Sequence, residues 1–197
     1  MICIKNNVST IVKLVINHLV CGIYSLMLLL IFYSFADGRL LYVGSIISAV
    51  FYLCLIYSFM WTAGAKDANS FYSSNIKKTD GLLLITLATL PSIVTNVLAT
   101  VLHFFKSDVE FAEKTADLIY PVLYYINYLF MQCMYSGLFV TLNGSAANIH
   151  PVWFLLSIIP ALLVGTIAYT FGFKSFRLRT LFGIKYDVEK EKIKQNY

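Results

Sequence analysis

Apolar residues along the chain fall into five long runs that short polar segments separate. A helix needs about 20 apolar residues to cross the hydrocarbon core of a bilayer. The first run is also too long for the apolar centre of a signal peptide, so we expect it to be kept as a span. The pattern therefore predicts four membrane-spanning helices, at about 14–35, 41–62, 82–105 and 153–173.

The remaining run, residues 118–142, is apolar but unusually rich in tyrosine. It holds Tyr120, Tyr124, Tyr125, Tyr128 and Tyr135, together with amide side chains. Tyrosine prefers the headgroup level of a membrane, where its ring is in apolar surroundings and its hydroxyl is wet. The pattern favours a re-entrant or interfacial segment here. Twenty-five residues are also long enough to span, so a fifth transmembrane helix is the alternative.

The positions of the basic residues favour one of these two topologies over the other. Cytoplasmic loops of membrane proteins hold most of the lysines and arginines. Four spans with both termini inside place twelve of the fifteen basic residues in the cytoplasm, whereas five spans place ten there. We expect an integral membrane domain at 1–173 and a basic cytoplasmic tail at 174–197.

Composition supports a membrane environment for most of the chain. Apolar residues make up 59% and charged residues 13%, against about 45–50% and about 25% in soluble domains. A soluble domain, a secreted disulfide scaffold, a disordered protein and a nucleic-acid-binding protein are all excluded. The predicted fold class is an all-α polytopic membrane helix bundle, with the lipid bilayer as its main partner.

Motifs of known chemistry are missing. The sequence has no HExxH, no phosphate-binding GxxxxGK and no GxSxG, and its four cysteines lack metal-ligand spacing. All ten acidic residues lie outside the apolar runs, which argues against an ion-coupled carrier. His18 stands near the start of the first run, His103 near the end of the third, and His150 in a loop. We expect no enzyme, no catalytic or metal-binding residue and no cofactor.

Polar residues inside the runs have structural explanations. Pro91 should kink the third span, and Ser92, Thr95 and Asn96 follow it closely enough to bond the loosened backbone. A pocket lined by this kinked patch is the alternative. In the last span, small residues recur at four-residue spacing and predict a close-packing face, made of Ser157, Ala161 and Gly165.

The polar loop 64–81 is the strongest candidate for a functional contact. Lys66, Asp67 and Asn69 follow the second span, and Asp80 precedes the third. We expect these four residues to contact a protein partner beside the basic tail. The alternative for Asp80 is a helix cap, because a carboxylate stabilises the positive end of a helix.

Three short elements of the chain carry a resemblance to other proteins. G-x-K-D-x-N (64–69), D-G-L (80–82) and AYTFGFKS (168–175) resemble an uncharacterised group of small multi-spanning proteins from low-GC Gram-positive bacteria. The resemblance implies a multi-pass protein of the bacterial plasma membrane and no particular activity.

Two functions fit these predictions. The first is a non-enzymatic membrane subunit or interaction protein that acts through its cytoplasmic loop and tail. The alternative is a small-molecule uptake component similar to the substrate-binding subunits of energy-coupling-factor transporters. Those subunits usually have six spans and a small-residue motif on the first helix, where this chain has the bulky segment 26–32.

Overall fold

The structure, a computed structural model, describes residues 2–36, 40–69, 80–105, 119–146 and 149–174. These residues form helices and no strand. The all-helical class is thereby confirmed, and four helical stretches at the positions of the predicted spans are long and apolar enough to cross a membrane. They are α1 (Ile2–Ala36), α2 (Leu41–Ala68), α3 (Asp80–Phe105), and the short α6 (Val152–Leu156) continued by α7 (Ile158–Phe173).

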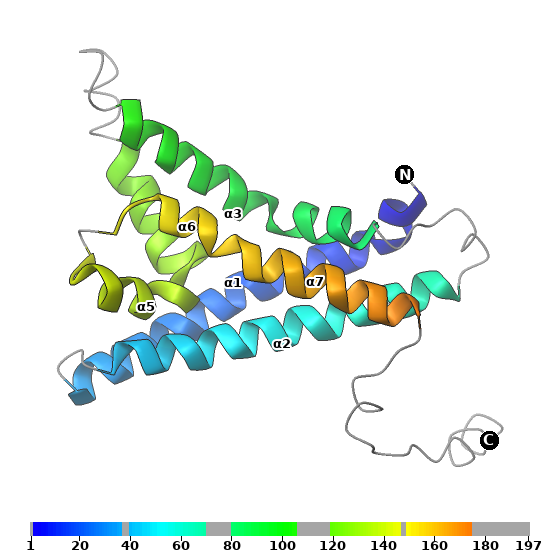
Figure 1. Cartoon of the computed structure of the whole chain (residues 1–197), viewed down its shortest axis with the longest axis horizontal. Helices are drawn as coiled ribbons and strands as arrows, with labels where there is room; N and C mark the ends of the chain where they lie inside the picture. The colour runs from blue at the N-terminus through cyan, green and yellow to red at the C-terminus, as the bar shows by residue number, and fades with distance from the viewer. Residues whose placement is uncertain (1, 37–39, 70–79, 106–118, 147–148, 175–197) are drawn as a thin grey trace.

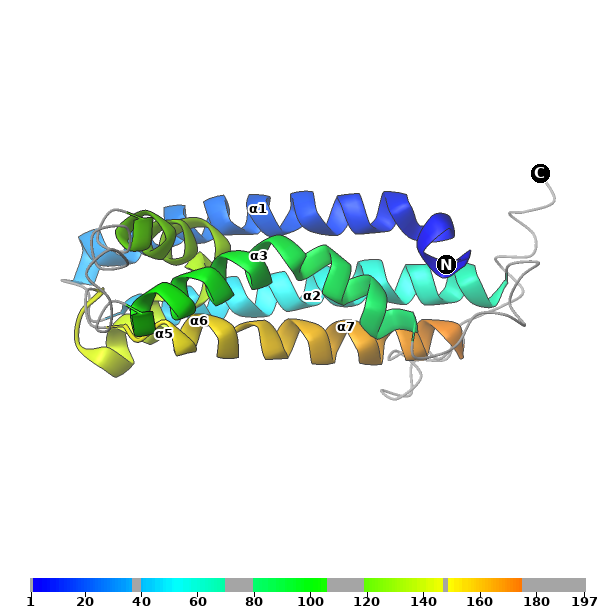
Figure 2. The ribbon, with the colours of Figure 1, turned by 90° about the horizontal axis from the view of Figure 1, so that it is seen from above.

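The long helices run along a common axis, with α3 crossing the others obliquely (Figures 1 and 2). The start of α1 and the end of α7 lie at the same end of the bundle, which we call the N-terminal end. Helix α2 packs mainly against α7 and α1, and α3 packs against α7 and α1. The predicted tail from residue 175 on, and most of the predicted loop, lie outside the described residues.

Two of the helices extend well beyond the apolar runs. Helix α1 begins at Ile2 and not at the predicted residue 14, and α2 continues past residue 62 to Ala68. The added turns contain polar side chains that are buried between helices, Asn7 and Asp67 among them. Helix α2 therefore continues beyond the apolar run at 41–62, because hydropathy does not register a polar side chain that is hydrogen-bonded by a neighbouring helix.

The tyrosine-rich run folds as a helical hairpin, residues 119–143. A helix at 119–126 widens into a π-helical turn, Asn127–Met131, and breaks at Gln132 before α5 (Cys133–Asn143) begins. The Tyr120 ring lies 5.5 Å from that of His103, near the end of α3. Tyr124 donates a hydrogen bond to the carbonyl of Ala146, just beyond α5. Both ends of the hairpin thus lie at one end of the bundle, opposite the N-terminal end (Figure 1).

Burial in this bundle is the reverse of that in a soluble protein. Large apolar side chains such as Met27, Leu30 and Leu163 are about 60% exposed, whereas polar side chains such as Asn7, Asn96 and Gln132 are buried. An exposed apolar surface around a polar interior is stable only when the surroundings are themselves apolar. The surface therefore matches a lipid environment.

Glycine lets α2 and α7 approach backbone to backbone. A Cβ on Gly64 would meet the backbone of Tyr169, and a Cβ on Gly172 would meet the backbone of Trp61. The buried Ala161 and Ala168 continue the same contact along α7. Small residues of this kind are the usual basis of helix packing in membranes.

Candidate functional site: a polar cavity in the middle of the bundle

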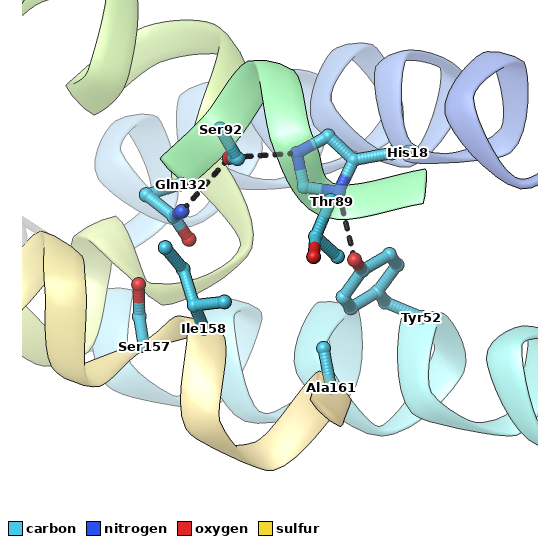
Figure 3. A pocket seen from close by; sticks show the side chains of 8 residues that line it. All are labelled: His18, Tyr52, Thr89, Ser92, Gln132, Ser157, Ile158 and Ala161. Atoms are coloured by element: carbon cyan, nitrogen blue, oxygen red, sulfur yellow. Dashed lines mark hydrogen bonds between the residues drawn. The ribbon is translucent and has the colours of Figure 1, made fainter. Parts of the chain in front are cut away.

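A cluster of hydrogen-bonded side chains occupies the centre of the bundle. His18 lies near the middle of α1, not near the start of the span as the apolar run suggested. Its Nδ1 is 2.7 Å from the hydroxyl oxygen of Tyr52 on α2, and its Nε2 is 3.4 Å from the hydroxyl oxygen of Ser92 on α3. His18 therefore connects three of the long helices (Figure 3).

The hairpin reaches this cluster with its broken point. Gln132, where the hairpin turns back, donates from Nε2 to the Ser92 hydroxyl at 3.1 Å. It is only 2% exposed. The hairpin therefore enters from one end of the bundle, reaches its centre at Gln132, and returns to the same end.

Side chains replace the backbone bonds that the hairpin loses at its break. Ser136 donates to the carbonyl of Tyr128 at 2.8 Å and is 3.3 Å from that of Gln132. Ser45 on α2 accepts from the Gly137 amide at 2.8 Å. Non-helical backbone at membrane depth requires such protein partners, because lipid offers none.

A second break lies at the same level, between α6 and α7. The Ser157 hydroxyl donates to the Phe154 carbonyl at 2.7 Å, and the Asn96 amide donates to the same carbonyl at 3.1 Å. Pro160 follows in the first turn of α7, where the missing amide hydrogen is tolerated. Helix α3 has its own irregular point at Pro91, beside Ser92, and Figure 1 shows α3 changing direction near its middle.

These irregular points surround one small cavity. Its volume is about 10 Å³, close to the smallest space that holds a water molecule. In Figure 3 the side chains around it come from α1, α2, α3, α7, the hairpin and the break before α7. The lining residues are His18, Tyr52, Thr89, Ser92, Gln132, Ser157, Ile158 and Ala161.

An apolar recess of about 180 Å³ lies on the other side of His18 and Ser92. Its remaining lining is apolar and comes from α1, from α3 and from Met131 of the hairpin. His18 and Ser92 thus stand between a polar cavity and an apolar recess.

The predicted contact residues do not share one surface. Lys66 and Asn69 are exposed near the end of α2, and Asp80 is half-buried in the first turn of α3. Asp67 is helical and fully buried, so its predicted place on a surface loop is wrong. Its Oδ2 accepts hydrogen bonds from Asn7 Nδ2 at 2.7 Å and from the Tyr169 hydroxyl at 2.8 Å.

Two histidines that are distant in the sequence lie together. The rings of His103 and His150 are 4.9 Å apart, beside Tyr120 and Phe104. Within the described residues, no group of three His, Cys, Asp or Glu side chains is placed to hold a metal ion.

Sequence reasoning found part of the central site. It noted Ser92 beside Pro91, and it noted Ser157 and Ala161 as a packing face. It did not predict that the carboxyl group of Asp67 is buried between helices. It also missed the roles of His18, Tyr52, Thr89 and Gln132. One signal was present in the sequence: each missed residue is a hydrogen-bonding side chain inside an apolar run, where such residues are expensive unless paired.

Comparisons of the chain with protein-family models, with curated proteins and with solved structures find no match. The bacterial resemblance noted above stays a prediction. The function of the protein is therefore inferred from the geometry of its site.

Proposed function

We propose that this protein is a component of a membrane transport system that binds a small polar solute in the middle of its helix bundle. Its proposed location is the bacterial plasma membrane, with the hairpin 119–143 as a re-entrant segment. The proposal belongs to the class of small-molecule uptake components.

The observation that supports it is the convergence of three helix irregularities on one polar cavity. Pro91, the break at Gln132 and the break at Ser157 come from separate segments of the chain and meet at the same depth. Broken helices near the bilayer midplane are the usual way in which transport proteins build a binding site. A bundle with a purely structural interior has no need of two helix breaks and a proline at one level.

The closed cavity also indicates how a solute would enter. At about 10 Å³ it has no room for a metabolite, whose pocket typically measures about 300 Å³ or more. Binding therefore requires the segments to separate at their irregular points. Such points have fewer backbone hydrogen bonds to break than a continuous helix has.

Thiol accessibility tests the proposal. In a protein without its four native cysteines, Ser157→Cys places a thiol at the cavity, and Leu163→Cys places one on the exposed face of the same helix as the control. We expect a small, charged, membrane-impermeant thiosulfonate to modify position 157 from one side of a proteoliposome and to leave position 163 unmodified. Protection of position 157 from both sides would mean that the cavity is a sealed structural core.

An interaction protein is the second candidate, and the exposure of Lys66 and Asn69 at the N-terminal end of the bundle favours it. Most of the loop that would form this surface lies outside the described residues. If this function is correct, Asn69→Ala should abolish co-purification of a partner while membrane abundance stays unchanged. Unchanged co-purification with Asn69→Ala and with Lys66→Ala would contradict it.

A further inference from the structure

The polar atoms that face the central cavity are mainly hydrogen-bond acceptors. Gln132 uses its Nε2 on Ser92, and its Oε1 accepts no hydrogen bond from the described residues. Figure 3 shows this oxygen turned away from Ser92, toward the side of Ser157 and Ile158. The Gln132 side chain is almost fully buried and lines the cavity, and an amide oxygen without a donor in such surroundings is costly, which indicates that a donor belongs in the cavity beside it.

The hydroxyl oxygens of Thr89 and Ser157, which also line the cavity, can only accept hydrogen bonds from a ligand, because their hydrogens are already used. Thr89 donates its hydrogen to the Ile85 carbonyl at 2.9 Å, and Ser157 donates its hydrogen to the Phe154 carbonyl at 2.7 Å. Each hydroxyl has one hydrogen and two lone pairs. With the hydrogens used on the helix backbone, the lone pairs remain for a ligand.

We propose that the cavity is a donor-selective site that holds one water molecule in the closed state, with Gln132 Oε1 accepting one of its hydrogens and the hydroxyl oxygen of Thr89 or Ser157 accepting the other. The volume of about 10 Å³ admits one such molecule. This inference names the ligand of the proposed solute site and rests on that proposal for its functional meaning.

The lining disfavours charged ligands of this size. No carboxylate lines the cavity, so a cation would lose its hydration without a counter-charge. An anion would face oxygen lone pairs. Water is neutral and donates two hydrogen bonds, which suits an amide oxygen and one hydroxyl oxygen. When the site opens, the same acceptors favour a solute with a neutral N–H or O–H group over a carboxylate or phosphate.

Water also explains how the hairpin is connected to the other helices. Gln132 belongs to the hairpin, Thr89 to α3, and Ser157 to the break before α7. Among the described residues no direct side-chain hydrogen bond joins Gln132 to Thr89 or Ser157. A shared water, with its two hydrogens, would link the hairpin to α3 or to the break before α7, and its exchange would release that link.

Water-edited solid-state NMR in lipid bilayers tests this site. The chain has two glutamines, Gln132 and Gln195, so Gln195→Asn leaves a single glutamine side-chain amide to observe. We expect rapid magnetisation transfer from water to the Gln132 amide. Absence of transfer in this otherwise native protein would overturn the proposal.

A matched pair of variants identifies the acceptors. Thr89→Val keeps the side-chain shape and removes one acceptor from the cavity. Thr86→Val is the control, because Thr86 lies one turn earlier on α3, is half-buried outside the lining of the cavity and bonds its own Leu82 carbonyl in the same way. We expect the transfer to fall several-fold with Thr89→Val and to stay unchanged with Thr86→Val.

Equal transfer in the two variants would overturn the assignment of Thr89, and Ser157→Ala repeats the test should Thr89→Val fail to fold.

The NMR experiment and the thiol experiment test the two proposals separately. Water at Gln132 with position 157 protected from both sides would support the water site and contradict the transport role. The opposite pair of results would support transport and overturn the water site.

Discussion

Individual polar residues determine how the helices of this protein meet. Asn7, Asp67 and Tyr169 come from α1, α2 and α7 and are fully buried at the N-terminal end of the bundle. A helix of the length of α2 is about 40 Å long and exceeds the roughly 30 Å hydrocarbon core. Asp67, one residue from the end of α2, is therefore near the membrane surface, where a buried carboxylate is less costly than at the centre.

Asp67→Ala tests whether this residue is structural or a contact for a partner. Its loss removes one hydrogen bond from the Asn7 amide and one from the Tyr169 hydroxyl, which should cost roughly 2–4 kcal/mol of stability. We expect reduced membrane abundance and a lower Tm in detergent. Asn69→Ala, two residues away and exposed, is the control and should leave both unchanged. Normal abundance of Asp67→Ala would show that its hydrogen bonds contribute little.

At the scale of elements, the contact between α2 and α7 depends on glycine more than on side-chain interlocking. Gly64 and Gly172 allow two backbones to touch, and no other residue leaves that space free. The contact of the hairpin with α2 and α3 depends instead on side-chain hydrogen bonds at its broken turn. Close packing makes the first contact rigid, whereas the second can exchange partners.

Gly64→Ala should therefore be strongly destabilising. The new Cβ would collide with the Tyr169 backbone, and overpacking typically costs about 1–3 kcal/mol or more where nothing can move. Gly44→Ala on the same helix is the control, because the three atoms nearest to its Cβ all belong to the ring of Phe32, whose side chain can rotate. We expect thermal unfolding to separate the two variants clearly. Equal Tm values would mean that α2 and α7 are not in backbone contact.

At the scale of the whole molecule, the path of the hairpin sets the topology. If residues 119–143 return to the end from which they enter, the loops on either side of them share one face of the membrane. Four spans then place both termini on the other face, as the distribution of basic residues also predicts.

Single cysteines at the two loops measure this directly. In a background without native cysteines, Ser107→Cys and Ser145→Cys should both react with an impermeant maleimide on intact cells. A fluorescent protein fused after Tyr197 should fluoresce, and alkaline phosphatase fused there should be inactive. Labelling of only one loop cysteine would mean that residues 119–143 span the membrane and that the four-span topology is wrong.

The sequence by itself determined the class of the protein and the approximate position of its helices. Apolar runs of more than 20 residues predict four long helices, and α3 spans residues 80–105 against the predicted 82–105. This prediction succeeds because the free energy of transferring a helix into lipid is approximately a sum over its residues. It does not depend on which other helices pack against it.

Only the tertiary structure revealed the central site. His18 and Gln132 are more than a hundred residues apart, yet both bond Ser92. Hydropathy counts a polar residue in an apolar run as a penalty, but a partner on another helix removes most of that penalty. Which residues become partners depends on helix rotation, on the glycines that set helix distances, and on where the hairpin turns. These are properties of packing between distant segments, and a one-dimensional pattern does not contain them.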